Sequence, residues 1–296
     1  MGCKATLSLG PSPVTLHCEP TRKGGRMGEW LRSPIRGVLL DITGVLYESS
    51  AEHGTVIPGS VKAVNRLRES GMPFRLVTNE TTTPTKVLLD KLRSFGYQLE
   101  ERELFSPIPA VVKLLHQEQL VPHLLVHPKV EGELRVGEKG SPASCVVLGD
   151  AEDNFSYANL NSAFRALMVM PRPRLITLGY GRYYKHNQQL QLDVGVYAKA
   201  LEFACGVESE VVGKPSPAFF NQALADMGVQ AKEAVMVGDD ISSDVEGAQK
   251  CGMRGVLVRT GKFTSSLLPH PTITPDCVVD NLAEAVDQIL AAKGKN

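Results

Sequence analysis

The sequence predicts an α/β protein with a Rossmann-like parallel-sheet core and an inserted α/β domain. Apolar runs such as 38–40 do not alternate with polar residues, which is typical of strands buried on both faces of a parallel sheet. Segments with apolar residues at helical spacing separate these runs. Residues 105–207 carry strands and helices of their own, so we expect 35–104 and 208–296 to form one core around an inserted domain.

The size and composition of the chain restrict its class. Its 296 residues suffice for about two domains, and 43% apolar and 22% charged residues are ordinary for a globular protein. Lysine plus arginine equals aspartate plus glutamate at 32 each, which argues against a general nucleic-acid or anionic-membrane surface. No run reaches the ~18 apolar residues of a membrane span. The six cysteines lack C-x-x-C and zinc-site spacing, which indicates the reduced thiols of a cytoplasmic protein.

The first 34 residues differ from the rest of the chain. They are rich in glycine, proline, serine and arginine without periodicity, so we expect 1–34 to be a disordered N-terminal extension. The opening MGCKAT fits an N-myristoylation pattern at Gly2, with Cys3 as a second acylation site. Met27 is an alternative start, and the scarcity of acids also fits a weak mitochondrial presequence. These three interpretations stay open.

Residues 35–104 show the order strand, helix, strand, helix. Val61, Val64 and Leu67 recur at helical spacing, and Thr83 before Pro84 is a candidate helix cap. We expect helices at 60–71 and 83–96 and strands at 38–40 and 74–78.

The remaining segments repeat this alternation. In 105–207 we expect helices at 106–119, 157–168 and 192–205 and strands at 123–127, 145–149 and 175–178. In 208–296 we expect strands at 210–213, 234–238 and 255–258 and helices at 216–228, 244–251 and 282–292. The helix at 157–168 is expected to present one apolar face, made of Tyr157, Leu160, Phe164 and Leu167.

Polar side chains follow four of the expected strands: Asp41, Thr78 with Asn79, Lys214 and Asp239. Because the carboxyl ends of parallel strands share one edge, we expect these side chains to lie together. An aspartate can attack phosphorus, and Thr78 and Asn79 can donate hydrogen bonds to phosphate oxygens. Lys214 can neutralise a phosphoryl group, and Asp41 with Asp239 can hold Mg²⁺ through oxygen ligands. The pattern therefore predicts phosphoryl transfer.

The segments DITGVL, VTNE, VVGKPSP and VGDDISSD resemble the four motifs of the haloacid dehalogenase-like phosphatase superfamily, from about residue 36 to the C-terminus. The resemblance implies that Asp41 is the nucleophile and that Lys214 stabilises the phosphoryl group. It implies that Asp239, Asp41 and the backbone carbonyl of Thr43 bind Mg²⁺ and that Asp244 supports the site. The substrate-binding residues it implies are Asp41, Ile42, Thr43, Thr78, Asn79 and Lys214. It gives Asp240 no firm role, and we expect that residue to be structural.

The spacing of the motifs locates the insertion. Between Asn79 and Lys214 lie 214 − 79 = 135 positions, far more than the ~30 residues of one strand–helix–strand unit. The inserted segment, 105–207, resembles the type-2 cap of this superfamily, which implies that it closes over the site and selects the substrate. We expect a mobile glycine-containing loop at 179–185, where Arg182 or Lys185 reaches a second phosphate; the alternative is a solvated basic hairpin.

Within the superfamily, DVGVYAKALEFACG, EVVGKPSP and VRTGKF resemble members that hydrolyse inorganic pyrophosphate and P–N bonds of phospholysine, phosphohistidine and imidodiphosphate. That resemblance implies a homodimer of the cytoplasm and nucleus that acts on small phosphorylated substrates or phosphohistidine proteins. Thr43 stands where most superfamily phosphatases carry a second aspartate, the general acid, which favours substrates whose leaving group needs little protonation. A pyridoxal-phosphate or sugar-phosphate monoesterase and an inactive binding scaffold are the alternatives.

Overall fold

The computed structural model of the chain describes residues 28–50, 53–138, 140–187 and 189–293. The predictions for residues 1–27, including lipidation at Gly2 and Cys3 and a start at Met27, lie outside the described residues.

Residues 28–34 are ordered, so the expectation of disorder is wrong for this part of the N-terminal extension. Glu29–Leu31 forms a helical turn, and its Trp30 and Leu31 side chains are buried against the core. Arg254 holds the segment by donating hydrogen bonds to the carbonyls of Trp30 and Ser33. The burial of two large apolar side chains offsets the entropy of ordering a polar segment.

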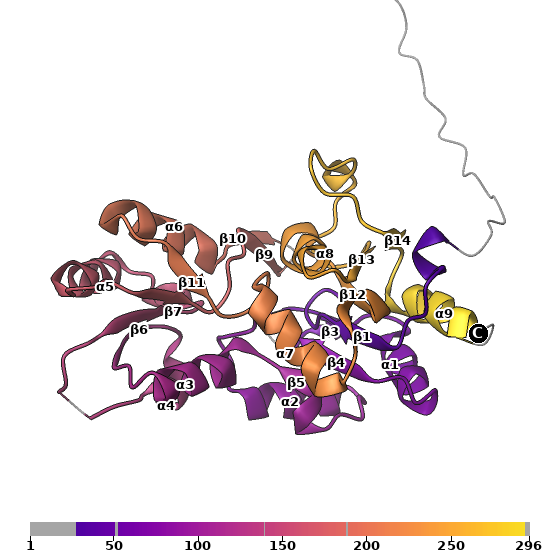
Figure 1. Cartoon of the computed structure of the whole chain (residues 1–296), viewed down its shortest axis with the longest axis horizontal. Helices are drawn as coiled ribbons and strands as arrows, with labels where there is room; N and C mark the ends of the chain where they lie inside the picture. Colours follow the sequence, from indigo (N-terminus) through magenta and orange to yellow (C-terminus); the bar gives the residue numbers. More distant parts are fainter. Residues whose placement is uncertain (1–27, 51–52, 139, 188, 294–296) are drawn as a thin grey trace, which may run out of the picture.

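A parallel sheet forms the core. Within the described residues it contains six strands in the order β14-β13-β12-β1-β4-β5, and every neighbouring pair is parallel. The strands are β1 (Gly37–Leu40), β4 (Phe74–Val77), β5 (Leu104–Phe105), β12 (Ala234–Gly238), β13 (Arg254–Val258) and β14 (Cys277–Val279). The central neighbours β1 and β12 therefore come from opposite ends of the chain, and Figure 1 shows them side by side.

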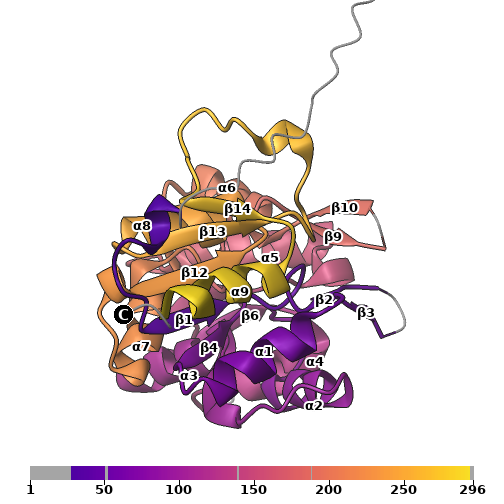
Figure 2. The ribbon, with the colours of Figure 1, turned by 90° about the vertical axis from the view of Figure 1, so that its right-hand side faces the viewer.

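Helices cover both faces of this sheet, which explains why β1 is apolar throughout. Val38 and Leu40 pack on one face against α1 (Ser60–Glu69), α2 (Thr85–Ser94) and α9 (Leu282–Lys293). Leu39, pointing the other way, packs against α7 (Pro217–Met227) and α8 (Gly247–Lys250). Figure 2 shows α1 and α9 lying together over the first face. The apolar residues of β1 thus pack against helices on both faces of the sheet.

A second, smaller parallel sheet lies beside the core (Figure 1). In the described part of the chain its four strands are β11 (Ser209–Val211), β8 (Leu175–Thr177), β7 (Cys145–Leu148) and β6 (Pro122–Leu125), in that order. One face packs against α5 (Tyr157–Val169) and α6 (Val194–Cys205), and the other against α3 (Pro107–Gln117) and α4 (Pro128–Leu134). We call these strands and helices the second unit. The predicted fold class, a Rossmann-like parallel-sheet core with an inserted α/β unit, is confirmed.

Two short antiparallel hairpins lie near the junction of the sheets. One joins β2 (Tyr47–Glu48) to β3 (Thr55–Val56), and the other joins β9 (Tyr183–His186) to β10 (Gln189–Leu192). The second hairpin corrects two expectations. Residues 183–185 are paired strand and not loop, and the helix expected from 192 begins at Val194 because Leu192 belongs to β10.

The strand before Lys214 lies in a different sheet from the one expected. We placed it in the core, together with the strands that end before Asp41 and Asp239. β11 pairs instead with β8 of the second unit. A short strand such as β11 carries no local marker of which sheet it joins, because that choice depends on long-range pairing.

Two further local expectations are wrong. Tyr157 is 86% exposed at the start of α5, so only the later residues of the expected apolar face pack inward. Pro84 and not Thr83 occupies the N-cap position of α2, and no described side chain caps that end. Among the helices of the described residues, none combines the length and apolar character that crossing a membrane requires.

Candidate active site

Three neighbouring core strands bring polar residues to one edge of the sheet. β1, β4 and β12 end just before Asp41, Thr78 and Asp239, and all three side chains are buried. The backbone N–H of Asp41 donates to the carbonyl of Val237 on the neighbouring strand, which holds Asp41 at the sheet edge. The carboxyl ends of parallel strands thus assemble the cluster that their order in the sequence predicted.

Lys214 enters this cluster from the second unit. Its Nζ lies 2.6 Å from Oδ1 of Asp41 and 2.8 Å from Oδ1 of Asp244. Burial alone would lower the pKa of Lys214, but the charges of Asp244 and Asp41 outweigh it and raise that pKa. Burial and the charge of Asp41 raise the pKa of Asp244 to about 7, although Lys214 opposes the shift. Lys214 is therefore a buried cation held between two carboxyl groups.

Carboxylate oxygens of Asp41, Asp239 and Asp244 lie within 4.8 Å of one another. Burial, with the charges of Asp41 and Asp244, raises the pKa of Asp239 well above its ordinary value. Its Oδ2 accepts the backbone N–H of Lys262 at 2.7 Å, whereas its buried Oδ1 has no hydrogen-bond partner among the described residues. A divalent cation at Oδ1 would satisfy that oxygen and relieve the repulsion, so the residues present fit a metal.

Two glycines form a cradle around Asp239. Gly44 and Gly261 both have positive φ angles, 88° and 64°. A Cβ on either glycine would lie 2.2 Å or 2.0 Å from Oδ2 of Asp239, closer than real contacts allow. The backbone therefore approaches the carboxylate so closely that only glycine fits at these positions.

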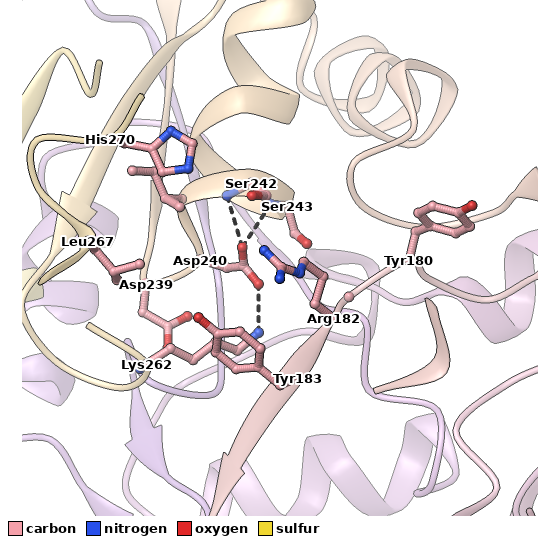
Figure 3. Close-up of a pocket in the computed structure, with 12 residues that line it drawn as sticks. Tyr180, Arg182, Tyr183, Asp239, Asp240, Ser242, Ser243, Lys262, Leu267 and His270 are labelled. Atoms are coloured by element: carbon pink, nitrogen blue, oxygen red, sulfur yellow. Dashed lines mark hydrogen bonds and ion pairs between the residues drawn. The ribbon is translucent and has the colours of Figure 1, made fainter. Parts of the chain in front are cut away.

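Asp240 makes hydrogen bonds to neighbouring residues, consistent with the expectation that it is structural. It accepts hydrogen bonds from the backbone of Ser242 and Ser243, both at 2.9 Å, and from Nζ of Lys262 at 2.7 Å (Figure 3). Burial alone would raise the pKa of Asp240, but Lys262 and these hydrogen bonds lower it to about 2. Asp240 thus caps the π-helical turn Ile241–Glu246, which carries Asp244.

The site residues after β4 differ in their contacts. The Thr78 hydroxyl accepts the backbone N–H of Glu80 at 3.0 Å and lines the cavity that contains Asp41. The Asn79 side chain donates to the carbonyl of Lys214 at 2.8 Å and accepts its backbone N–H at 2.8 Å. Asn79 therefore contacts the lysine directly, a contact that the sequence did not predict.

The two residues that follow Asp41 point in different directions. Ile42 is fully buried in the apolar core, and its side chain does not line the cavity. Thr43 is half-buried and lines the cavity. Of the two predicted substrate contacts, only Thr43 offers its side chain to the cavity.

A cavity of about 420 Å³ lies between the core and the second unit and contains Asp41, Lys214 and Asp239. Lys185 lines it, and its Nζ donates to the carbonyl of Gly261 at 3.3 Å. Arg182 instead lines a separate cavity of about 80 Å³, where Figure 3 shows it beside Asp240. The two basic residues that we treated as equivalent therefore face different spaces.

Several lining residues were not predicted: Glu80, Asp150, Tyr184, Asp193 and Lys262. Lys262 lies in the loop after β13, four positions past the strand end (262 − 258 = 4), so the strand-end argument alone did not single it out. Burial, with the charges of Asp193 and two nearby glutamates, raises the pKa of Asp150 to about 7. Asp150 and Asp193 also follow strands, β7 and β10, but the sequence does not show that these strand ends face the core, because that approach is a tertiary contact.

Comparison with known proteins defines the class of this site. A family model described as "Haloacid dehalogenase-like hydrolase" matches residues 38–139, and one described as "HAD-hyrolase-like" matches residues 211–285. A p-nitrophenyl phosphatase from Archaeoglobus fulgidus shares the fold with a TM-score of 0.75 and 28% identity, over 86% of this chain and 99% of that chain. NagD from E. coli shares the fold with a TM-score of 0.71. The chain belongs to the haloacid dehalogenase-like hydrolase family, so the predicted enzyme class is confirmed.

Relatives with higher sequence identity to this chain than these structures share one name. The phospholysine phosphohistidine inorganic pyrophosphate phosphatase of Homo sapiens is 52% identical over 86% of this chain and 94% of its own length. The protein of the same name from Xenopus laevis is 49% identical over 91% of this chain and 100% of its own length. The predicted resemblance to this group is therefore confirmed.

Proposed function

We propose that this chain is a Mg²⁺-dependent phosphatase that hydrolyses inorganic pyrophosphate and P–N bonds through an aspartyl-phosphate on Asp41. The observation that carries the proposal is the buried contact of Asp41 with Lys214 beside Asp239, in one cavity. The names of its 52% and 49% identical relatives supply the substrate class. An inactive scaffold would not explain this cluster of buried charges. Burial of charged groups costs free energy, and clusters of buried ionisable groups are typical of active sites.

The metal would be held by Asp41, Asp239 and the backbone carbonyl of Thr43. When bound, Mg²⁺ would supply positive charge against the carboxylates and the phosphoryl oxygens. Asp244 is better suited to hold Lys214, because one of its oxygens faces Nζ of Lys214 and the other accepts the backbone N–H of Asp240.

In the first step, a carboxylate oxygen of Asp41 attacks phosphorus and the bond to the leaving group breaks. The leaving phosphate or nitrogen keeps the electron pair of that bond. Lys214 neutralises the transferred phosphoryl group, and the hydroxyl of Thr78 can donate a hydrogen bond to it. Positioning and neutralisation of charge are the main requirements of this step, and both are provided by buried residues.

In the second step, water attacks the phosphorus and the Asp41 carboxylate is released, with the water proton passing to phosphate or solvent. Thr43 has no acidic proton near neutral pH, so it cannot protonate an alkoxide in the first step. A pyrophosphate needs little such help, and the nitrogen of a phosphoramidate takes a proton from solvent. We therefore propose that Thr43 restricts the enzyme to anhydride and P–N substrates such as pyrophosphate and imidodiphosphate.

The second unit, together with the β9–β10 hairpin, is proposed to act as the type-2 cap over the core formed by 35–104 and 208–296, except that β11 of the latter segment belongs to the second unit. Its β9 strand brings Lys185 to the cavity, and a hydrogen bond of 3.2 Å joins His186 to Ser49 of the core. The cavity volume suits a small phosphorylated substrate. A homodimer, a place in the cytoplasm and nucleus, and action on phosphohistidine proteins are proposals that rest on the similarity to the named relatives.

The deciding experiment measures phosphate release by the full chain from a substrate panel with Mg²⁺ and with excess chelator. The panel contains pyrophosphate, imidodiphosphate, phosphohistidine, phospholysine, pyridoxal phosphate and a sugar phosphate. We expect release from the first four, loss of at least about 10³-fold in chelator and in Asp41→Asn, and little release from the last two. Preference for the last two would favour the monoesterase, and release that survives Asp41→Asn would contradict the mechanism.

A further inference from the structure

The side-chain amide of Asn79 is matched to the backbone of Lys214. Its Nδ2 donates to the Lys214 carbonyl at 2.8 Å, and its Oδ1 accepts the Lys214 N–H at 2.8 Å. A flipped amide would place two donors together and two acceptors together, so this orientation is the one that satisfies all four groups. The side-chain amide of Asn79 thus pairs with both backbone groups of Lys214, as the backbone of a neighbouring strand would.

This pair of hydrogen bonds joins different parts of the fold. Asn79 follows β4 of the core, whereas Lys214 follows β11 of the second unit, 135 residues later. The Nζ of Lys214 must nevertheless reach Asp41 of the core, at 2.6 Å. The hydrogen bonds to Asn79 attach the Lys214 backbone to the core, although β11, the strand before Lys214, belongs to the sheet of the second unit.

Two glycines make room for the amide. Gly213, with φ 135°, precedes Lys214, and a Cβ there would lie 2.9 Å from Oδ1 of Asn79. Gly179, with φ 149°, follows β8, and a Cβ there would lie 3.0 Å from Nδ2 of Asn79. Two segments of the second unit therefore close on this one side chain with backbone that leaves no space for a larger residue.

We infer that Asn79 is a positioning residue that fixes Lys214 relative to Asp41. The inference rests on the proposed function, in which Lys214 neutralises the transferred phosphoryl group. It revises the expectation that Asn79 is mainly a phosphate ligand, because Oδ1 cannot donate and one Nδ2 hydrogen is already used by Lys214. A displacement of Lys214 by about 1 Å would suffice for a large loss of rate.

The test is a double-mutant cycle in the full chain between Asn79→Ala and Lys214→Ala. One readout is kcat/KM for pyrophosphate with Mg²⁺, and the other is the Kd of inorganic phosphate with Mg²⁺, which needs no turnover. With Lys214 present, we expect Asn79→Ala to lower kcat/KM about 10- to 100-fold. With Lys214→Ala, we expect it to change either quantity less than about 3-fold, because the group that it positions is gone.

Equal losses in both backgrounds would overturn the inference, whether they came from direct phosphate binding by Asn79 or from general damage to the fold. Asn154→Ala is the matched control, since it removes a similar bond, from Nδ2 to the Val126 carbonyl at 3.2 Å, and should leave kcat/KM unchanged. If Asn79→Ala does not fold, Gly213→Ala replaces it in the cycle and displaces Oδ1 of Asn79 instead.

The two readouts separate this inference from the proposed function. If the wild-type chain does not hydrolyse pyrophosphate, the proposed function fails, and the phosphate-binding cycle still measures the coupling between Asn79 and Lys214. If it does hydrolyse pyrophosphate and both cycles are additive, the positioning role alone is wrong.

Discussion

The Nζ of Lys214 lies 2.6 Å from Oδ1 of Asp41, although the two residues are 173 positions apart and follow strands of different sheets. The proposed nucleophile, Asp41, belongs to the core. The positive charge beside it comes from Lys214, which follows β11 of the second unit. A change in how the two units sit together would therefore change the charge around Asp41. This arrangement makes the contacts between the units part of the catalytic geometry that we propose.

Thr43→Asp should broaden the range of substrates. Thr43 lines the cavity beside Asp41, so a carboxyl group there could protonate an alkoxide leaving group. General acid catalysis contributes about 10²–10⁴-fold, so alkyl monoester hydrolysis should rise relative to pyrophosphate hydrolysis by at least about 10-fold. The measurement is the ratio of kcat/KM for a sugar phosphate to that for pyrophosphate, with Thr43→Asn as the uncharged control. An unchanged ratio, or a wild type that already prefers alkyl esters, would refute the role given to Thr43.

Lys185→Ala should weaken pyrophosphate turnover selectively. Lys185 shares the cavity with Asp41, whereas Arg182 faces the smaller cavity, so Arg182→Ala is the matched control. We expect Lys185→Ala to lower kcat/KM for pyrophosphate about 10-fold, the contribution of one charged hydrogen bond to the second phosphate. For p-nitrophenyl phosphate, which has a single phosphate, the change should stay within about 3-fold. Equal effects of Lys185→Ala on both substrates would count against this contact.

Gly261→Ala should raise the Mg²⁺ concentration needed for activity. The new Cβ would meet Oδ2 of Asp239 and displace a proposed metal ligand. Gly206→Ala is the control, because its φ of 65° nearly equals the 64° of Gly261 but a Cβ there meets nothing within 4 Å. Both variants should lose about 1–2 kcal/mol of stability from the backbone strain, and Gly261→Ala alone should shift the half-maximal Mg²⁺ concentration by about 10-fold. A similar shift of the half-maximal Mg²⁺ concentration in both variants would show that the close approach of Gly261 to Asp239 does not affect Mg²⁺ binding.

Asp150→Asn should change how stability depends on pH. Burial raises the pKa of Asp150 to about 7, above its value in the unfolded chain. Between pH 4 and 7 the folded chain thus keeps a proton that the unfolded chain has released, so this group makes the wild type less stable as pH rises. The free energy of unfolding of Asp150→Asn relative to wild type should increase by about 2 kcal/mol from pH 5 to pH 8. Asp153→Asn, at an exposed neighbour, should show no such trend in denaturant titrations at the two pH values.

Much of the local structure could be predicted from the pattern of the sequence. The strand Ala234–Gly238 and the helix that ends before Gly228 have the expected bounds, because a run of apolar residues and a glycine in the left-handed region are local features. The hairpin of β9 and β10 was expected only as the alternative to a mobile loop, since its residues are partly or fully exposed and bury no apolar face that would mark a strand. The buried turn at Trp30 was missed because the polar residues around it predict disorder.

The chemical character of the site was determined by the sequence alone. Residue type and position after an apolar run placed Asp41, Thr78 and Asp239 at one sheet edge, because a parallel sheet brings the ends of its strands together. Only the tertiary structure decided which partners these residues meet. It placed Lys214 after a strand of the second unit, joined its backbone to Asn79 and separated Lys185 from Arg182. The reason is physical: periodicity records which way a side chain points along its own segment, whereas contacts between distant segments depend on packing and hydrogen bonding across the whole fold.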